Sequence, residues 1–122
     1  MLGLKLLTDP RWANIAESNL EEILTDHAWC EQKAAANALY LITNNSEHIE
    51  LAQKMAEIAM EEMDHFNQVV EIIKQRGYTL GRERKDDYVN ELMAFVKKNA
   101  SRNTSFIDRL LFAAMIEARS CE

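Results

Sequence analysis

Residues 51–73 decide the fold: they read LAQKMAEIAMEEMDHFNQVVEII, and selected side chains in them recur at alternating steps of four and three. This spacing places those side chains on one side of an α-helix, the side that packs against other helices. The stripe consists of Leu51, Met55, Ile58, Glu62, His65, Val69 and Ile72. The stretch therefore predicts a long core-facing helix whose apolar stripe carries ionisable groups at its centre.

The rest of the composition also favours helices. Pro10 is the only proline, the three glycines are Gly3, Gly77 and Gly81, and Ala, Leu, Glu, Met and Lys abound. The length of 122 residues is typical of one domain. We therefore expect an all-α fold and a single domain over 1–122.

Local signals divide the chain into helices. Thr8, Asp9 and Pro10 predict a helix start, and the helical pattern then runs to about Asn44. A turn at 44–46 leads into a second helix, which runs to about 76 and is stopped by Gly77. The two form an αα-hairpin. After a connector at 77–84 we expect a short crossover helix at about 86–98, a polar loop at 99–104 and a last core helix from about 105.

The first and last of these helices carry similar stripes. The first stripe consists of Leu20, Leu24, His27, Glu31, Ala34, Ala38 and Leu41. The last consists of Ile107, Leu110, Ala114, Glu117 and Cys121. Each of the three predicted core stripes thus holds a glutamate.

The hairpin brings two of these glutamates together. Glu31 and Glu62 are equidistant from the predicted turn at Ser46, about fifteen residues or roughly 23 Å of helix away from it. The two carboxylates should therefore face each other inside the hairpin. His65 lies one helical turn beyond Glu62 on the same face, so Glu62-x-x-His65 offers an oxygen and a nitrogen to one metal ion.

The chemistry of the stripes indicates a metal site. Carboxylates in an apolar stripe are costly without a counter-charge, and no Lys or Arg occupies the three stripes. Carboxylate with imidazole suits non-haem iron, whereas structural zinc prefers thiolates. Two-iron bundles use one Glu on each of two helices and Glu-x-x-His on each of the other two. We therefore predict Glu31, Glu62, His65 and Glu117 as ligands of two iron ions.

One part of this pattern is not found in the sequence. The second Glu-x-x-His is missing, and the chain stops at Glu122 in the middle of a helical pattern. We expect a fourth helix to follow in a longer gene product, or another chain to complete the site.

Other features allow more than one interpretation. Glu-x-x-His also occurs on solvated helix faces, and His27, one turn from Glu31, suits a core histidine with satisfied hydrogen bonds or a partner of the ligands better than a ligand itself. The net charge of −6 excludes nonspecific nucleic-acid binding over the whole surface. The local basic cluster with Arg82, Arg84 and Lys85 is either a phosphate contact or an ordinary charged connector.

The compartment follows from two further observations. Cys30 and Cys121 lie far apart and form neither a zinc motif nor a disulfide framework, which favours a reducing cytoplasm. The N-terminal apolar run is too short for a signal peptide, and no stretch is long enough to span a bilayer. We expect a cytoplasmic protein that has no contact with a membrane.

Several long segments resemble the di-iron tRNA hydroxylases that act on 2-methylthio-isopentenyladenosine, which belong to the ferritin-like superfamily. The match spans essentially the whole chain, and its similar segments are 24–34 (LTDHAWCEQKA), 61–66 (EEMDHF), 81–86 (GRERKD), 88–92 (YVNEL) and 109–122 (RLLFAAMIEARSCE). The resemblance implies a ferritin-like four-helix bundle, here with three core helices and the short crossover helix. It places Glu31, Glu62, His65 and Glu117 at the family's ligand positions.

The resemblance also implies an activity. A di-iron centre would use O₂ to hydroxylate the isopentenyl side chain of a modified adenosine in tRNA, a monooxygenase reaction. The electrons would come from a separate reductase, because no flavin or nucleotide-binding pattern is present. The basic residues Arg82, Arg84 and Lys85 would guide the tRNA.

Two alternatives remain open from the residues. In the first, two hairpins meet in a homodimer and share one di-iron site, as in a ferritin-like iron-binding protein. In the second, the chain is an inactive truncated remnant whose exposed apolar stripe makes it self-associate.

Overall fold

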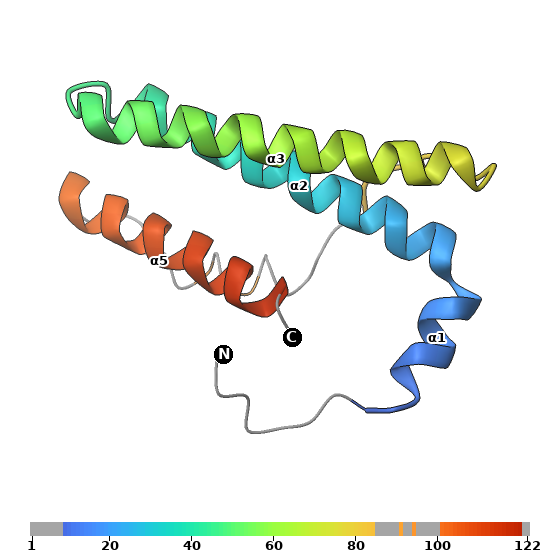
Figure 1. The fold of residues 1–122 in the computed structure, drawn as a ribbon. Coiled ribbons are helices and arrows are strands. Elements are labelled where there is room, and N and C mark those ends of the chain that lie inside the picture. The colour runs from blue at the N-terminus through green and yellow to red at the C-terminus, as the bar shows by residue number, and fades with distance from the viewer. Residues whose placement is uncertain (1–8, 85–90, 92–93, 95–100, 121–122) are drawn as a thin grey trace. The chain divides into compact units, whose positions relative to one another are not determined.

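The computed structural model describes residues 9–84, 91, 94 and 101–120. Within this part of the chain all regular structure is helical, which confirms the predicted all-α class (Figure 1). The helices are α1 (Trp12–Ser18), α2 (Leu20–Asn44), α3 (Ile49–Gln75) and α5 (Arg102–Ser120). Glu91 and Ala94 are also helical, but the rest of the predicted crossover helix at 86–98 lies outside the described residues.

The chain divides into two compact units. Residues 11–84 form one unit, which contains α1, α2 and α3, and residues 1–10 with 85–122 form the other, which contains α5. The prediction of a single domain over 1–122 stays a prediction. None of the helices in the described part combines the length and the apolar character needed to cross a bilayer.

The first unit is built on a hairpin of two long helices, α2 and α3, which run side by side (Figure 1). The side of α2 that is buried carries mostly small residues, whereas α3 contributes larger ones. The buried hydrophobic residues are Ala28, Ala35, Ala38 and Leu41 of α2 and Ala59, Val69 and Ile73 of α3. The predicted αα-hairpin is thus confirmed.

The predicted first helix is interrupted, which is a correction. In place of one helix from 10 to 44, α1 ends at Ser18 and α2 begins at Leu20. Asn19 leaves the helical conformation, with φ −128° and ψ 28°, and its side-chain amide donates a hydrogen bond of 2.9 Å to the Ile15 carbonyl. Asparagine side chains compete with the helical backbone in this way, so a Ser-Asn pair can end a helix that periodicity alone would continue.

The end of α3 follows the prediction. Gly77 has a φ of +70°, a left-handed conformation that glycine adopts without steric cost. Its N–H donates to the Lys74 carbonyl and the Tyr78 N–H to the Ile73 carbonyl, both at 3.0 Å, which is the Schellman arrangement. Tyr78 also packs against the small core cluster that contains Ile73. The chain therefore leaves α3 in a defined direction.

The helix α5 begins a little earlier than predicted. The Ser101 hydroxyl accepts a hydrogen bond of 3.2 Å from the Thr104 N–H, so Ser101 caps the helix in place of the expected start near 105. Ile107 of the predicted stripe is exposed. Glu117 lies within α5, but its side chain is outside the described part of the chain.

Candidate metal centre

Three predicted ligands converge between the two long helices. One ligand atom each of Glu31, Glu62 and His65 can be chosen so that all lie within 4.8 Å of one another. Glu31 comes from α2, and the other two come from α3, where His65 Nδ1 lies 3.7 Å from Glu62 Oε2. The hairpin symmetry that the sequence predicted therefore brings these groups together.

The cluster lies at the edge of the helix contact. The Glu31 and Glu62 side chains are 17% and 19% exposed, and that of His65 is 44% exposed. On α2 the buried residues nearest to Glu31 are Ala28 and Ala35, which lie outside the predicted stripe, whereas Ala38 and Leu41 of the stripe are buried as predicted. The predicted stripe of α2 thus coincides with the buried side near the turn but not around Glu31.

Two acidic groups share this small space. Partial burial raises the pKa of Glu62 above its ordinary value, and the hydrogen bond with Glu31 and the negative charge of Glu31 raise it further. His65 acts in the opposite direction, because an imidazole beside the carboxylate favours the charged form. The metal-free site therefore holds a proton more readily than an isolated glutamate does.

His27 supports Glu31 from the same helix. Its Nε2 lies 3.2 Å from Glu31 Oε1, one helical turn away, and its side chain is 56% exposed. His27 is not part of the three-residue cluster. This position agrees with the interpretation of His27 as a partner that orients a ligand carboxylate.

The donor set suits a hard or borderline cation such as iron. It combines two carboxylates with one imidazole, and within the described residues neither carboxylate is paired with a Lys or Arg. A metal ion would offset the negative charge of both acids. The residues therefore fit a metal ion, and their role as ligands stays a prediction.

The described part of the structure does not show the remaining ligands of a two-iron site. The fourth predicted ligand, Glu117, has a side chain outside the described residues. The sequence contains three histidines, His27, His48 and His65, and only one Glu-x-x-His. The described cluster amounts to one Glu and one Glu-x-x-His, half of the pattern of a two-metal bundle.

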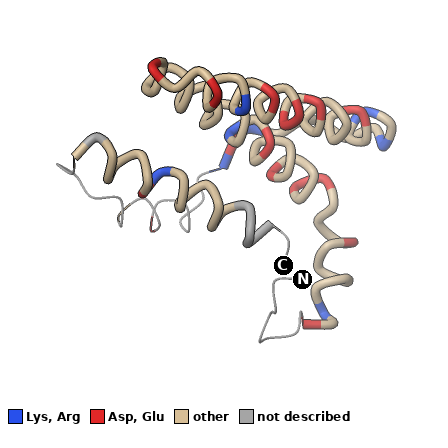
Figure 2. Tube along the Cα trace, turned by 60° about the vertical axis from the view of Figure 1, so that its left-hand side comes forward, with Lys and Arg blue, Asp and Glu red and all other residues tan. Residues whose placement is uncertain are grey.

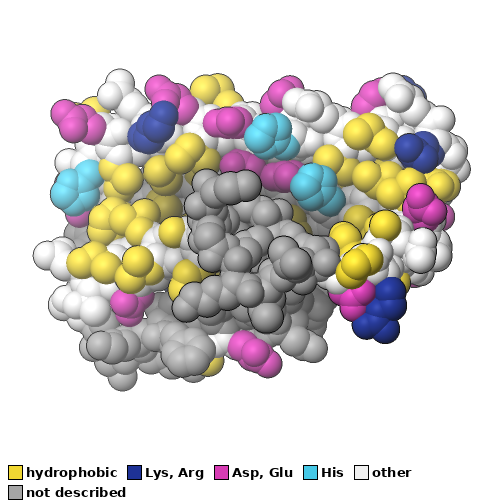
Figure 3. Space-filling model, turned by 60° about the horizontal axis from the view of Figure 1, so that its bottom comes forward, with side chains coloured by type: hydrophobic (Ala, Val, Ile, Leu, Met, Phe, Trp, Pro, Cys, Tyr) yellow, Lys and Arg dark blue, Asp and Glu magenta, His cyan; other side chains and the backbone are white. Residues whose placement is uncertain are grey.

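The face that carries the cluster is mixed in character. Figure 3 shows histidine and acidic side chains gathered in the middle of one face, with hydrophobic side chains on both sides of them. Along both long helices acidic residues outnumber basic ones (Figure 2). Such a face suits a cation better than it suits an anionic backbone.

The predicted basic cluster has a different environment at each of its three residues. Arg84 donates hydrogen bonds to both Asp26 carboxylate oxygens and to Glu22 Oε2, so its charge is engaged within the protein. The hydrogen bond with Asp26 is the main cause of the raised pKa of Arg84. Arg82 is exposed, and Lys85 lies outside the described residues. Sequence reasoning missed Glu22 and Asp26 as partners, although their spacing of four marks one acidic helix face.

Known proteins resemble this chain over most of its length. Residues 3–122 match the family tRNA-(MS[2]IO[6]A)-hydroxylase (MiaE). A curated relative from Pseudomonas putida, the tRNA 2-(methylsulfanyl)-N(6)-isopentenyladenosine(37) hydroxylase, is 37% identical over 115 residues, which cover 94% of this chain and 55% of the relative.

A solved structure gives the same result for the fold. The protein 43 with aldehyde deformylating oxygenase activity from Synechococcus matches with a TM-score of 0.85 and 33% identity, over 96% of this chain and 57% of that one. The ferritin-like fold class is thereby confirmed. The chain spans a little over half the length of each of these two proteins.

Proposed function

The chain belongs to the tRNA-(MS[2]IO[6]A)-hydroxylase (MiaE) family, and on that premise we propose that it serves in hydroxylating the isopentenyl side chain of a modified adenosine in tRNA. The observation that carries the proposal is the convergence of Glu31, Glu62 and His65 within 4.8 Å. The name of the Pseudomonas putida relative, a hydroxylase of isopentenyladenosine in tRNA, supports the choice of substrate.

Each residue of the cluster has a distinct task in this proposal. The carboxylates of Glu31 and Glu62 and the imidazole of His65 would hold the iron, and Glu117 is proposed from the sequence as a further ligand. The iron centre would supply O₂ activation, so that one oxygen atom enters a C–H bond and the other leaves as water, with two electrons and two protons consumed. A separate reductase would deliver the electrons.

The metal-free site is prepared for two cations. The pKa of Glu62 is raised by partial burial and by the negative charge of Glu31, a charge that a bound cation would offset. His27 Nε2 lies 3.2 Å from Glu31 Oε1, where it would limit the rotation of this carboxylate. These contacts keep the donor atoms together while the metal is absent.

Fewer basic residues are available to contact the tRNA than the sequence suggested. Because Arg84 is engaged with Glu22 and Asp26, Arg82 and Lys85 remain as the proposed phosphate contacts of the predicted cluster. A substrate in tRNA and a separate reductase both belong to the cytoplasm, the compartment that we propose.

A second candidate function follows from the fact that one hairpin supplies only half of the ligands of a two-iron site. One hairpin supplies one Glu and one Glu-x-x-His, so two copies related by a twofold axis would supply four glutamates and two histidines. The protein would then be a ferritin-like iron-binding homodimer, in which Glu117 is dispensable. This arrangement predicts one iron per chain, against two per chain for the hydroxylase site.

Iron per chain, together with the molar mass, separates these candidates. We would reconstitute the protein anaerobically with Fe(II), desalt it, and compare it with Glu62→Ala and with the matched control Glu61→Ala, an exposed neighbour. Iron lost only in Glu62→Ala supports the site, and a dimeric mass with one iron per chain would favour the shared site. No specific iron in the wild type would contradict both and favour an inactive remnant.

Activity needs its own test. We would express the chain in cells whose tRNA carries the isopentenyl modification and measure the hydroxylated nucleoside by mass spectrometry of the digested tRNA. Hydroxylated nucleoside that disappears with Glu62→Ala and persists with Glu61→Ala supports the proposal. Equal levels in both variants would contradict it.

A further inference from the structure

The connector at 77–84 is tied along one side of α2 by polar contacts. The Glu21 carboxylate accepts hydrogen bonds from the Thr79 N–H and hydroxyl, both at 3.1 Å. The Gly81 N–H donates to Thr25 Oγ1 at 3.3 Å, and Lys33 Nζ lies 3.0 Å from Glu83 Oε1. Successive contacts of the connector thus reach from the start of α2 toward the level of Glu31.

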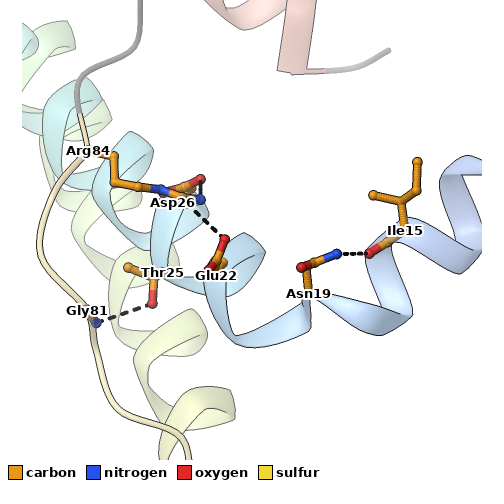
Figure 4. A network of polar contacts seen from close by, with 7 residues as sticks. All are labelled: Ile15, Asn19, Glu22, Thr25, Asp26, Gly81 and Arg84. Atoms are coloured by element: carbon orange, nitrogen blue, oxygen red, sulfur yellow. Dashed lines mark hydrogen bonds and ion pairs between the residues drawn. The ribbon is translucent and has the colours of Figure 1, made fainter.

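Arg84, the last residue of the connector, also contacts α2. Its guanidinium spans two acidic residues of one helix face, with Nε and Nη2 on the Asp26 carboxylate and Nη1 on Glu22 Oε2 at 2.9 Å (Figure 4). A two-pronged contact of this kind fixes direction as well as distance, which a lysine could not do equally well. Arg84 therefore works as a clamp between the connector and α2.

The two glycines of the connector suit this path. Gly77 takes the left-handed conformation that turns the chain out of α3. At Gly81 the backbone approaches α2 so closely that an added Cβ would lie 3.2 Å from Thr25 Cγ2. A Cβ at position 81 would therefore require the Thr25 side chain or the connector to shift by a few tenths of an ångström, and a larger side chain would require more.

The connector also reaches a side chain that is close in the sequence to a predicted ligand. The Trp29 indole N–H donates a hydrogen bond of 2.9 Å to the Gly81 carbonyl. The same indole packs on Phe66, with ring centroids 6.3 Å apart and planes inclined by 55°. Trp29 precedes Glu31 by two residues on α2, and Phe66 follows His65 on α3. The indole thus links the connector, α2 and α3 at positions that neighbour two predicted ligands in the sequence.

We propose that the connector is a strap that positions the metal ligands: Arg84 and Gly81 hold Trp29 against Phe66, and this fixes Glu31 opposite Glu62 and His65. The turn at 45–48 ties α2 to α3 at one end, and the strap ties them at the other. Sliding of one helix along the other is then blocked on both sides of the cluster. The inference rests on the proposed metal centre and makes Arg84 and Trp29 positioning residues.

The test compares neighbouring arginines. Arg84→Ala removes the clamp, Gly81→Val removes the close approach, and Arg82→Ala is the matched control, since Arg82 is exposed and outside the strap contacts described above. Arg84→Lys keeps the positive charge but loses the two-pronged guanidinium contact. The first readout is the nuclear Overhauser effect between the Trp29 and Phe66 rings in the metal-free protein. The second is the dissociation constant for Fe(II), measured by anaerobic equilibrium dialysis.

We expect Arg84→Ala and Gly81→Val to weaken the ring contact and to raise the Fe(II) dissociation constant by about threefold to tenfold, the scale of a few exposed polar contacts. In both readouts Arg84→Lys should lie between the wild type and Arg84→Ala. Arg82→Ala should match the wild type in both. A ring contact that persists in both strap variants would overturn the proposal. So would a lost ring contact with unchanged Fe(II) binding.

The two proposals fail in different ways. If the wild type binds no Fe(II), the proposed metal centre is wrong, whereas the ring contact in the metal-free protein still decides whether the strap holds α2 against α3. If the wild type binds Fe(II) and the strap variants bind it equally well, the metal centre stands and the strap is wrong.

Discussion

Replacing Glu62 by glutamine should have opposite effects with and without metal. In the metal-free protein two carboxylates approach within 4.8 Å. Two unit charges at that distance repel by about 1 kcal/mol in water and by about 3 kcal/mol at an effective dielectric constant of about 20. Since both side chains are partly exposed and solvent screens this repulsion, we expect Glu62→Gln to stabilise the metal-free protein at pH 7 by about 1 kcal/mol.

The pH dependence follows from the raised pKa of Glu62. The folded protein binds this proton more tightly than the unfolded chain does, so the metal-free protein loses stability as the pH rises from 4.5 through the raised pKa. Glutamine does not titrate. The advantage of Glu62→Gln should therefore be present at pH 7 and vanish below about pH 4.5, the ordinary pKa of a glutamate.

Bound metal should make the wild type more stable than Glu62→Gln. A ligand present at one hundred times its dissociation constant stabilises the folded state by about 2.7 kcal/mol, and only the wild type keeps the full donor set. Thermal unfolding followed by circular dichroism, with chelator and with anaerobic Fe(II), gives both comparisons. A 1 kcal/mol change corresponds to about 3 to 5 °C for a domain of this size. A lower melting temperature for metal-free Glu62→Gln at pH 7, or equal stabilisation of both proteins by Fe(II), would refute the reasoning.

Two further predictions concern the residues around the site and the strap. His27→Ala should raise the Fe(II) dissociation constant by about tenfold, because Glu31 loses its orienting partner. His27→Gln keeps an N–H donor and should recover part of the lost affinity. Equal Fe(II) binding by the wild type and both variants would contradict this. Gly77→Ala should destabilise the protein by about 1 to 2 kcal/mol, because alanine is strained at a φ of +70°. Urea unfolding measures the effect, and an unchanged midpoint would be contrary to it.

Much of the fold could be predicted from local signals. The stripes at spacings of four and three predicted α2 and α3, and Gly77 predicted where α3 ends, because a single glycine in the left-handed conformation satisfies the last carbonyls. The break at Asn19 could not be predicted from periodicity. It depends on a side chain that competes with the backbone for Ile15, and the apolar pattern continues across it.

The metal cluster was predictable for a geometric reason, and the strap was not. Two residues equidistant from a tight turn lie level in a hairpin, so the positions of Glu31 and Glu62 in the sequence were sufficient. Arg84 instead contacts residues 58 and 62 positions away. A basic connector and an acidic helix face are each common, and only the path of the chain between them decides whether they meet.

The small residues of α2 explain why the two acids can come so close. Ala28, Ala35 and Ala38 are nearly inaccessible and form most of the side of α2 that meets α3. Helices whose contact surface consists of alanines approach more closely than helices separated by leucines, because interaxial distance follows side-chain size. A glutamate at the edge of such a contact can reach across to the next helix without losing all of its hydration. The alanines that appear only to fill the core therefore set the separation at which Glu31 and Glu62 can share a proton or a metal ion.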